Sequence, residues 1–253
     1  MVLDSLVRHL HGFITEVGLS EAEWLAGIEF VTEAGHITDG RRQELILLAD
    51  VLGASMLVVD VNHPSSGRAT ESTVFGPFFV EDAPRYENGD DLANGAPGEP
   101  CHVTGRVMST SGGPLAGARI EVWQADDAGM YDVQYESLGE TRARGHLFSD
   151  EDGRFSFRTI RPTAYPIPTD GPVGRLLEAA NRSAMRPAHI HFRIAAAGHE
   201  TLTTHVFVAG DPFLDRDAVF GVRETLVAEF TSVDDGSCSV DYEFVLESRG
   251  RPG

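Results

Sequence analysis

The chain of 253 residues has little cysteine, since only Cys101 and Cys238 are present. Two cysteines are too few for a disulfide framework, and so low a content is typical of a protein from a reducing compartment. No window of about 18 consecutive apolar residues occurs, and the first residues, MVLDSLVRHLHG, lack the apolar core of a signal peptide. The sequence therefore predicts a cytoplasmic protein without a membrane-spanning helix.

Basic residues are also scarce. The chain has 20 Lys and Arg against 39 Asp and Glu, which gives a formal net charge of −19 at pH 7. A surface of that sign repels phosphate backbones and anionic lipid headgroups, so neither a nucleic acid nor a membrane is expected as a partner. Hydrophobic residues make up 42% of the chain and charged residues 23%, which argues against disorder and for a globular fold.

The first 63 residues show helical periodicity. Apolar residues recur at helical spacing after Ser20, and Glu23 lies three residues beyond that serine, as in a capping box. Over residues 45–59 apolar side chains occur on nearly all sides, which predicts a buried helix. We therefore expect residues 1–63 to form a helical segment.

From Glu71 onward the chain changes to short runs separated by Gly, Pro, Asp and Ser, which is the pattern of a β-sandwich with long loops. The stretch 161–174 carries four prolines, and a stiff loop of this length is usually functional. The sequence therefore predicts a mainly β fold, with a helical segment over residues 1–63 and a β-sandwich domain over residues 64–253. The predicted strands span residues 101–108, 118–125, 153–160, 189–196, 201–208 and 239–246.

The clearest local motif is RPAHIHF, in which His189 and His191 lie two residues apart in a predicted strand. Side chains alternate between the faces of a strand, so both imidazoles point the same way and can bind one metal ion. The motif also occurs where one ring is a hydrogen-bonded core residue, and on this motif alone both interpretations are open. A facial-triad iron site needs a carboxylate shortly after the pair, but the next acidic residue is Glu200.

Two tyrosines in loops, Tyr131 and Tyr165, are further candidate ligands. A phenol has an ordinary pKa of about 10, so it binds well only to an ion acidic enough to deprotonate it, which favours Fe(III) over Zn(II) or Mg(II). A single tyrosine is more often a packing residue whose hydroxyl is hydrogen-bonded. The combination of two tyrosines with the histidine pair indicates a β-sandwich that carries a non-haem iron site.

These motifs together resemble the intradiol ring-cleaving dioxygenases, which are non-haem Fe(III) enzymes. Members carry their ligands in the order Tyr, Tyr, His-x-His, and the intervals of 34, 24 and 2 residues here are similar to the family spacing. The resemblance implies one Fe(III) per chain, bound by Tyr131, Tyr165, His189 and His191. It is carried by RRQELILLADVLGASMLVVDVNH, ESTVFGPFF, GRVMSTSGGPLAGARIEVWQADDAGMYD, YPIPTDGPVG, RPAHIHFRIAAAGHETLTTH and DPFLDRDAVFGVRETLV.

The resemblance also implies roles for side chains around the iron. A catechol-type substrate displaces Tyr165 from the metal, whereas Tyr131 stays bound. Arg186 matches an arginine that lies against the substrate ring, where a planar cation stabilises negative charge in the transition state. His205 stands where catechol-cleaving relatives carry glutamine and the hydroxyquinol-cleaving branch carries histidine. The alternatives are a surface salt bridge for Arg186 and a solvent-facing strand position for His205.

Substrate choice is implied to depend on the helix and the loop ahead of the sandwich. Asp50 interrupts an apolar stretch, and a carboxylate in a buried helix needs a partner. That partner is either a structural hydrogen bond or the third hydroxyl of hydroxyquinol, benzene-1,2,4-triol. By resemblance the substrate pocket is lined by Leu47, Asp50, Val74, Phe75, Gly76, Pro77 and Phe78.

The resemblance therefore implies an enzyme of aromatic catabolism that cleaves hydroxyquinol with O2 to 3-hydroxy-cis,cis-muconate, the enol form of maleylacetate. The alternative within the enzyme class is a catechol or chlorocatechol 1,2-dioxygenase. The alternative from another class is a metal-free β-sandwich module that binds a partner through the same loops. Because the family dimerises through its helical segment, often around a lipid, a homodimer is expected and a lipid is a further candidate partner.

Overall fold

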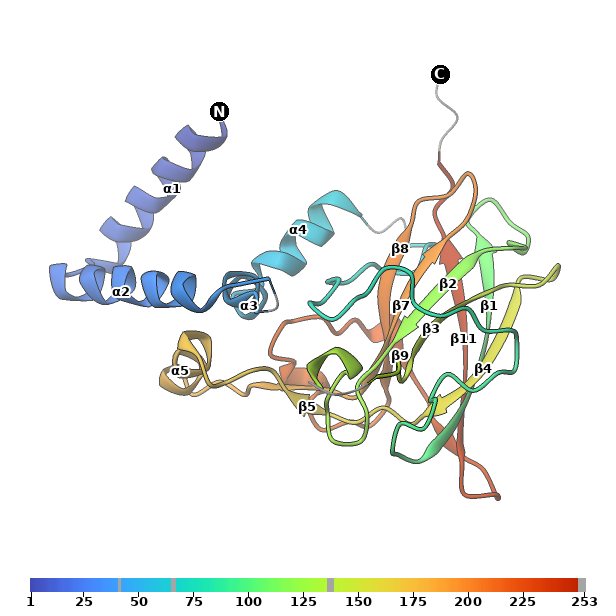
Figure 1. Ribbon diagram of the computed structural model, residues 1–253. Helices are drawn as coiled ribbons and strands as arrows, with labels where there is room; N and C mark the ends of the chain where they lie inside the picture. Colours follow the sequence, from blue (N-terminus) through green and yellow to red (C-terminus); the bar gives the residue numbers. More distant parts are fainter. Residues whose placement is uncertain (41, 65–66, 136–138, 250–253) are drawn as a thin grey trace.

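The computed structural model describes residues 1–40, 42–64, 67–135 and 139–249 of the chain. Figure 1 shows a β-sandwich with an arm of helices that extends from one side. The helices that precede the strands are α1 (Val2–Val17), α2 (Glu21–Ile37), α3 (Glu44–Val51) and α4 (Ala54–Asn62). The fold is thus a β-sandwich with a helical N-terminal segment, as the sequence predicts, although the α-helices contain as many residues as the strands.

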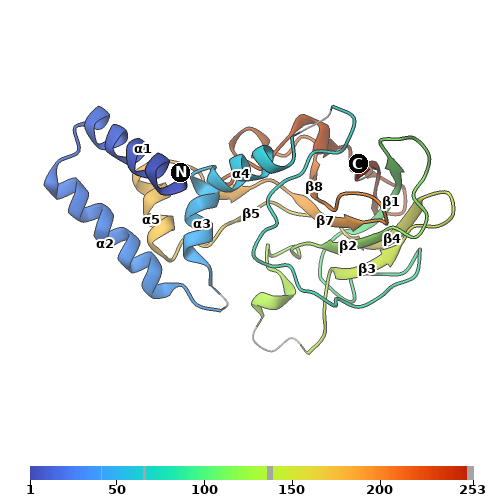
Figure 2. The same cartoon turned by 90° about the horizontal axis from the view of Figure 1, so that it is seen from above.

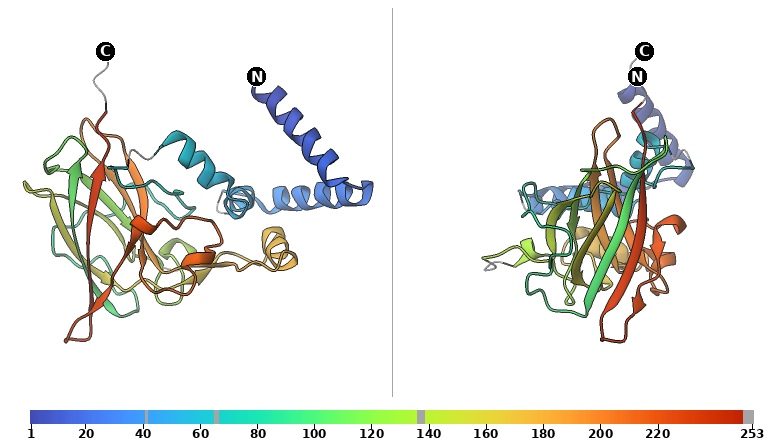
Figure 3. Two further views of the ribbon diagram at one scale, coloured as in Figure 1. Left: turned by 180° about the vertical axis from the view of Figure 1, so that it is seen from behind. Right: turned by 90° about the vertical axis from the view of Figure 1, so that its right-hand side faces the viewer.

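Helix α2 begins at the capping residues that the sequence indicates. The backbone N–H of Ser20 donates to Glu23 Oε2 at 2.9 Å, and the backbone N–H of Glu23 donates to Ser20 Oγ at 3.3 Å, so the capping box is confirmed. Gly18, with φ 62°, ends α1 in the left-handed conformation. Helices α1 and α2 project away from the sandwich (Figure 3), and none of the residues of α1 is buried.

The prediction of one buried helix over residues 45–59 was wrong. Gly53 has φ 72° and separates α3 from α4. Only one face of each short helix packs against the rest of the described chain, through residues such as Val51 and Met56. The other faces remain between 43% and 63% exposed at Leu45, Ile46, Leu52, Leu57 and Val58.

Two sheets form the sandwich, one in the order β10-β11-β1-β4 and the other in the order β3-β2-β7-β8-β9. All the predicted strands are confirmed, whereas β3 was missed because Arg144 and Gly145 at its start obscure the alternation. The pairs β1–β11 and β8–β9 are parallel, and the other pairs of the two sheets are antiparallel. The strands are β1 (Pro100–Ser109), β2 (Arg119–Trp123), β3 (Arg144–Phe148), β4 (Arg154–Ile160), β7 (His189–Ala195), β8 (Leu202–Val208), β9 (Val227–Ala228), β10 (Thr231–Ser232) and β11 (Cys238–Leu246).

The main core lies between the two sheets. Strand β7 contributes Ile190, Phe192 and Ile194 to it, and Phe155, Phe157 and Phe244 come from the facing sheet. Since side chains alternate along a strand, this arrangement leaves His189 and His191 on the other face of β7. Both cysteines are free and buried.

A second apolar cluster joins the helical segment to the sandwich. It contains Val51, Met56, Val74, Ile167, Val173, Leu177, Ala218 and Val219. Helix α5 (Pro172–Ala179) contacts α2 and α3 and lies beside the helical segment in Figure 2. The stretch 161–174, expected to be irregular, contains β5 (Tyr165–Pro166), which pairs with β6 (Met185–Arg186), and the start of α5. Within the described residues, none of the helices has the length and apolar character that a bilayer crossing needs.

Short 3-10 helices lie in the loops: η1 (Asp132–Gln134), η2 (Leu214–Arg216) and η3 (Glu224–Leu226). The first of them follows Tyr131 directly, and the second leads into the loop of residues 217–221. Both loops contribute to the candidate active site.

Candidate active site

Strand β7 brings two imidazoles together on its outer face. The Nε2 atoms of His189 and His191 lie 3.2 Å apart. Nδ1 of His189 lies 2.6 Å from the carbonyl oxygen of Pro187, which can only accept a hydrogen bond. The proton of His189 is therefore assigned to Nδ1, and its Nε2 presents a lone pair toward His191.

Two phenols meet these imidazoles. The Oη atom of Tyr131 lies 2.9 Å from the Oη atom of Tyr165 and 2.9 Å from Nε2 of His191. The Oη atom of Tyr165 lies 3.4 Å from Nε2 of His189. All four side chains are buried. The structure thus brings the four predicted metal ligands to one point, which we call the donor cluster.

Burial changes the acidity of the donor cluster. It raises the pKa of the phenols of Tyr131 and Tyr165 above their ordinary value, although the positive charge of Arg186 opposes the change. Burial also lowers the pKa of His189 and His191 well below the ordinary value of histidine. Without a metal, both imidazoles are neutral at pH 7 and both phenols keep their protons. Such phenols become ligands only of a strongly Lewis-acidic ion, so the donor cluster fits Fe(III).

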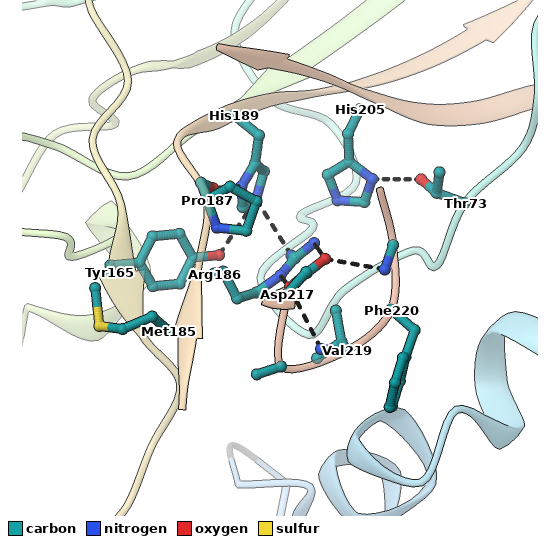
Figure 4. Close-up of polar contacts among 12 residues, drawn as sticks. Thr73, Tyr165, Met185, Arg186, Pro187, His189, His205, Asp217, Val219 and Phe220 are labelled. Atoms are coloured by element: carbon teal, nitrogen blue, oxygen red, sulfur yellow. Dashed lines mark hydrogen bonds and ion pairs between the residues drawn. The ribbon is translucent and has the colours of Figure 1, made fainter. Parts of the chain in front are cut away.

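Arg186 lies next to the donor cluster, with its Nη1 3.2 Å from Nε2 of His189. The remaining nitrogens face Asp217, with Nε 3.2 Å from Oδ1 and Nη2 3.4 Å from Oδ2 (Figure 4). Both side chains are buried, so the alternative of a surface salt bridge for Arg186 is wrong. By resemblance, the stretch DAVFGVRE that begins at Asp217 favours hydroxyquinol over catechol, but sequence reasoning assigned no individual role to Asp217, although an acidic residue directly before the apolar run AVF was a usable signal.

His205 lies opposite His191 on the neighbouring strand β8, and their ring centroids are 4.1 Å apart. It is fully buried, so the solvent-facing alternative is wrong. Burial, together with the positive charge of Arg186, lowers its pKa, so the ring is neutral at pH 7. Nδ1 hydrogen-bonds Thr73, which sequence reasoning missed, whereas Nε2 is buried without a partner in the described part of the chain (Figure 4).

A cavity of about 330 Å³ adjoins the donor cluster, and Tyr165 and Arg186 form part of its wall. Six of the seven predicted pocket residues line it, namely Leu47, Asp50, Val74, Gly76, Pro77 and Phe78. Phe75 does not line it, because its ring packs on Phe79 and Trp123 with centroids 4.6 and 5.9 Å away. Sequence reasoning missed Ala128, Gly129, Met130, Gln134, Pro166, Ile167, Pro168, Thr169 and Val219.

Comparison with known families matches both parts of the chain. Residues 74–248 match the family model described as "Dioxygenase", and residues 1–70 match the one described as "Catechol dioxygenase N terminus". The chain belongs to the intradiol dioxygenase family.

The alignments with individual relatives include nearly all of this dioxygenase. A 6-chlorohydroxyquinol 1,2-dioxygenase from Cupriavidus pinatubonensis is 58% identical over 97% of the chain and 89% of the relative. A hydroxyquinol 1,2-dioxygenase from Nocardioides simplex is 59% identical over 90% of the chain and 78% of the relative. The crystal structure of hydroxyquinol 1,2-dioxygenase from Pseudomonas putida DLL-E4 superimposes with a TM-score of 0.92 at 48% identity, covering 98% of this chain and 91% of that one.

Asp50 of the dioxygenase lies on α3, in the wall of the cavity. Its side chain is buried, and the hydroxyl of Ser55 acts on it to lower its pKa, so a structural partner of the kind considered for this carboxylate is at hand. Burial raises the pKa of Asp50 above its ordinary value, and the hydrogen bond from Ser55 and the charge of Arg186 oppose this only in part. A carboxylate thus faces the cavity in an environment that favours a further hydrogen-bond donor.

Proposed function

We propose that this dioxygenase cleaves hydroxyquinol with O2 between its two vicinal hydroxylated carbons, yielding 3-hydroxy-cis,cis-muconate, the enol form of maleylacetate. The proposal rests on two features that lie side by side. The donor cluster of two phenols and two imidazoles adjoins a cavity, and the wall of that cavity contains the buried carboxylate of Asp50. The names of two relatives, both hydroxyquinol 1,2-dioxygenases, support this substrate, and a third relative is named for 6-chlorohydroxyquinol, a chlorinated form of the same triol.

In this proposal Tyr131, Tyr165, His189 and His191 hold one Fe(III) per chain. When bound, Fe(III) supplies the Lewis acidity that ionises the two phenols and the two vicinal hydroxyls of the substrate. Tyr165 lines the cavity, whereas Tyr131 is 0% exposed. With the metal bound, Tyr165 would therefore be the phenol that takes up a proton from the diol, and Tyr131 would remain a metal ligand.

Arg186 and His205 act on the bound ring from the side of the sheet. The guanidinium of Arg186 is permanently charged and lies between the cavity and the donor cluster, so it stabilises negative charge that develops on the substrate. His205 does not line the cavity, but its neutral ring packs on those of His189 and His191 and its Nε2 has no partner in the described part of the chain, so it offers a hydrogen bond to a group bound at the donor cluster.

Selectivity for hydroxyquinol comes from the wall of the cavity that α3 forms, away from the donor cluster. When the vicinal diol faces the donor cluster, the third hydroxyl points toward α3, where Asp50 accepts its hydrogen bond. Leu47 and Val74 contact the apolar part of the ring, together with Pro77 and Phe78. A substrate without the third hydroxyl leaves the carboxylate unpaired, which disfavours catechol.

Two measurements on the purified protein test this function. Tyrosinate bound to Fe(III) absorbs visible light, so a coloured protein with about one high-spin ferric ion per chain is expected, together with O2 uptake that is fastest with hydroxyquinol. Stoichiometric zinc without a visible band would exclude the iron site, and a colourless protein without metal would favour the metal-free binding module. A preference for catechol or a chlorocatechol would exclude hydroxyquinol and leave the alternative dioxygenase activity.

We also propose a cytoplasmic homodimer formed through α1 and α2. None of the residues of α1 is buried, and a row of large apolar side chains on the two helices is exposed, which on a monomer is an unfavourable surface. The row comprises Leu3, Leu6, Leu10, Phe13, Val17, Trp24, Leu25, Ile28 and Val31. The same surface offers a place for a lipid between two copies.

Light scattering tests the dimer and mass spectrometry of extracts tests the lipid. The wild type should have the mass of two chains, and the double substitution Leu10→Glu and Phe13→Glu should give single chains. The control His11→Glu, on the same helix, should remain dimeric. A monomeric wild type excludes the dimer, and extracts free of lipid exclude the lipid.

A further inference from the structure

We propose that Asp217 is the positioning residue of Arg186: it engages two guanidinium nitrogens and thereby turns the third toward the donor cluster. The inference deepens the proposed function, since it concerns how the transition-state cation is held. Nε and Nη2 of Arg186 lie 3.2 and 3.4 Å from the two carboxylate oxygens of Asp217. Nη1 alone remains, and it lies 3.2 Å from Nε2 of His189 (Figure 4).

The carboxylate of Asp217 is itself fixed by its own loop. Oδ2 accepts a hydrogen bond from the backbone N–H of Gly221 at 2.9 Å, and Oδ1 accepts one from the backbone N–H of Val219 at 3.3 Å. The side chain is buried, and these two hydrogen bonds hold both of its oxygens. A planar guanidinium paired with a planar carboxylate at two points can adopt only one orientation. The backbone of residues 217–221 therefore sets the direction of Nη1.

Hydrogen bonds connect the loop of residues 217–221 to β6 and to α3. The backbone N–H of Ala218 donates to the carbonyl of Met185, the residue before Arg186, at 3.0 Å. Arg182 donates from Nη2 to the carbonyl of Ala218 at 3.2 Å and from Nη1 to the carbonyl of Val51, at the end of α3, at 2.5 Å. The loop that orients the guanidinium is thus held at a fixed place between β6 and α3.

The close fit of this loop depends on a glycine. A Cβ atom at Gly221 would lie 3.1 Å from Oδ2 of Asp217 and 3.2 Å from Nη2 of Arg186. A larger residue would press on both partners of the ion pair. The backbone of the loop thus approaches the Arg186–Asp217 ion pair at Gly221, where no side chain intervenes.

A double-mutant cycle tests the proposal. Asp217→Asn should lower kcat of the iron-loaded enzyme about tenfold or more in the wild-type background and by less than about twofold in an Arg186→Ala background, because a positioning residue acts only through its partner. The melting temperature should show the same coupling, since Asp217→Asn leaves a buried cation unpaired only while Arg186 is present. Equal losses of kcat in the two backgrounds would overturn the proposal.

Asp217→Glu separates position from charge. It keeps the ion pair but displaces the guanidinium by the length of one methylene, so the melting temperature should recover while kcat stays low. Recovery of kcat would mean that charge alone matters and would overturn the proposal. A crystal structure of Asp217→Asn should show Nη1 turned away from His189, and an unchanged guanidinium would also contradict it.

Asp211 provides a matched control. It too accepts hydrogen bonds from two backbone N–H groups, those of Phe213 and Ala188, at 2.8 and 3.0 Å, and the described residues give it no arginine partner. Asp211→Asn should lower the melting temperature equally in both Arg186 backgrounds. The cycle runs with whichever diol the wild type cleaves, so a failure of the hydroxyquinol assignment does not affect it.

Discussion

The indole ring of Trp123 lies nearly parallel to the imidazole of His191, with centroids 4.8 Å apart and planes inclined by 14°. The two residues face each other across β2 and β7. His189 is oriented by a hydrogen bond to Pro187, but Nδ1 of His191 has no such partner in the described part of the chain. Stacking on Trp123 therefore fixes the plane of this imidazole.

Loss of the stacked indole should weaken metal binding. In Trp123→Leu the imidazole of His191 is free to rotate, and we expect about a tenfold or greater loss of iron affinity, the effect typical of losing a group that orients a ligand. Iron content after dialysis against a chelator measures it. The exposed Trp24 on α2 is the control, since Trp24→Leu should retain iron. Full iron retention in Trp123→Leu would show that the strand alone orients the ring.

Gly76 should not tolerate a side chain. Its φ is 74°, and a Cβ atom there would lie 3.1 Å from Cε1 of His191. Gly76→Ala should therefore lower both the melting temperature and the iron content. Gly117 has φ 67° and open space around it, so Gly117→Ala carries only the backbone strain. If the two variants lose the same amount of iron, the contact with His191 is unimportant.

Asp50 should determine selectivity. Asp50→Leu removes the acceptor for the third hydroxyl, worth roughly 1.5 to 3 kcal/mol, so the ratio of kcat/KM for hydroxyquinol over catechol should fall about ten- to a hundredfold. The control Asp60→Leu changes an aspartate of α4 that pairs with Arg223 and does not line the cavity. Equal losses on both substrates would make Asp50 a structural residue of α3.

The same carboxylate should reduce stability at high pH. Burial raises the pKa of this carboxyl group in the folded state above the ordinary 3.8 of the unfolded chain. At a pH between the unfolded-state and the folded-state pKa, the folded state therefore binds more protons than the unfolded state. The contribution of Asp50 to the free energy of unfolding therefore falls as pH rises through that window. Asp50→Asn should therefore raise the melting temperature relative to the wild type by more at pH 8 than at pH 4. An identical difference at both pH values would contradict this.

Local rules account for what the sequence could predict. Strand alternation places His189 and His191 on one face, and the capping box at Ser20 starts α2, because both depend on residues a few positions apart. The link between Arg186 and Asp217 spans 31 residues and depends on how β6 and the loop 217–221 meet, which no local pattern contains.

Burial was the least predictable property. The apolar residues of α1 to α4 have the right spacing for helices, but whether they are covered depends on what packs on them, and in the described chain much of this surface is exposed. Helix α5 was hidden in a proline-rich stretch because Pro172, at its first position, is compatible with both a loop and a helix start. The division of the chain at residue 63 stays a prediction.

The donor cluster and α3 come from separate stretches of the chain. All four donors lie within residues 131–191, whereas the wall that carries Leu47 and Asp50 lies within residues 44–51 and is joined to the sheet side through Arg182. Exchanging residues of α3 can alter the shape and polarity of the cavity without moving a donor. In evolutionary terms, a lineage with this fold can change the lining of its cavity through its helices while the sandwich preserves the donor cluster.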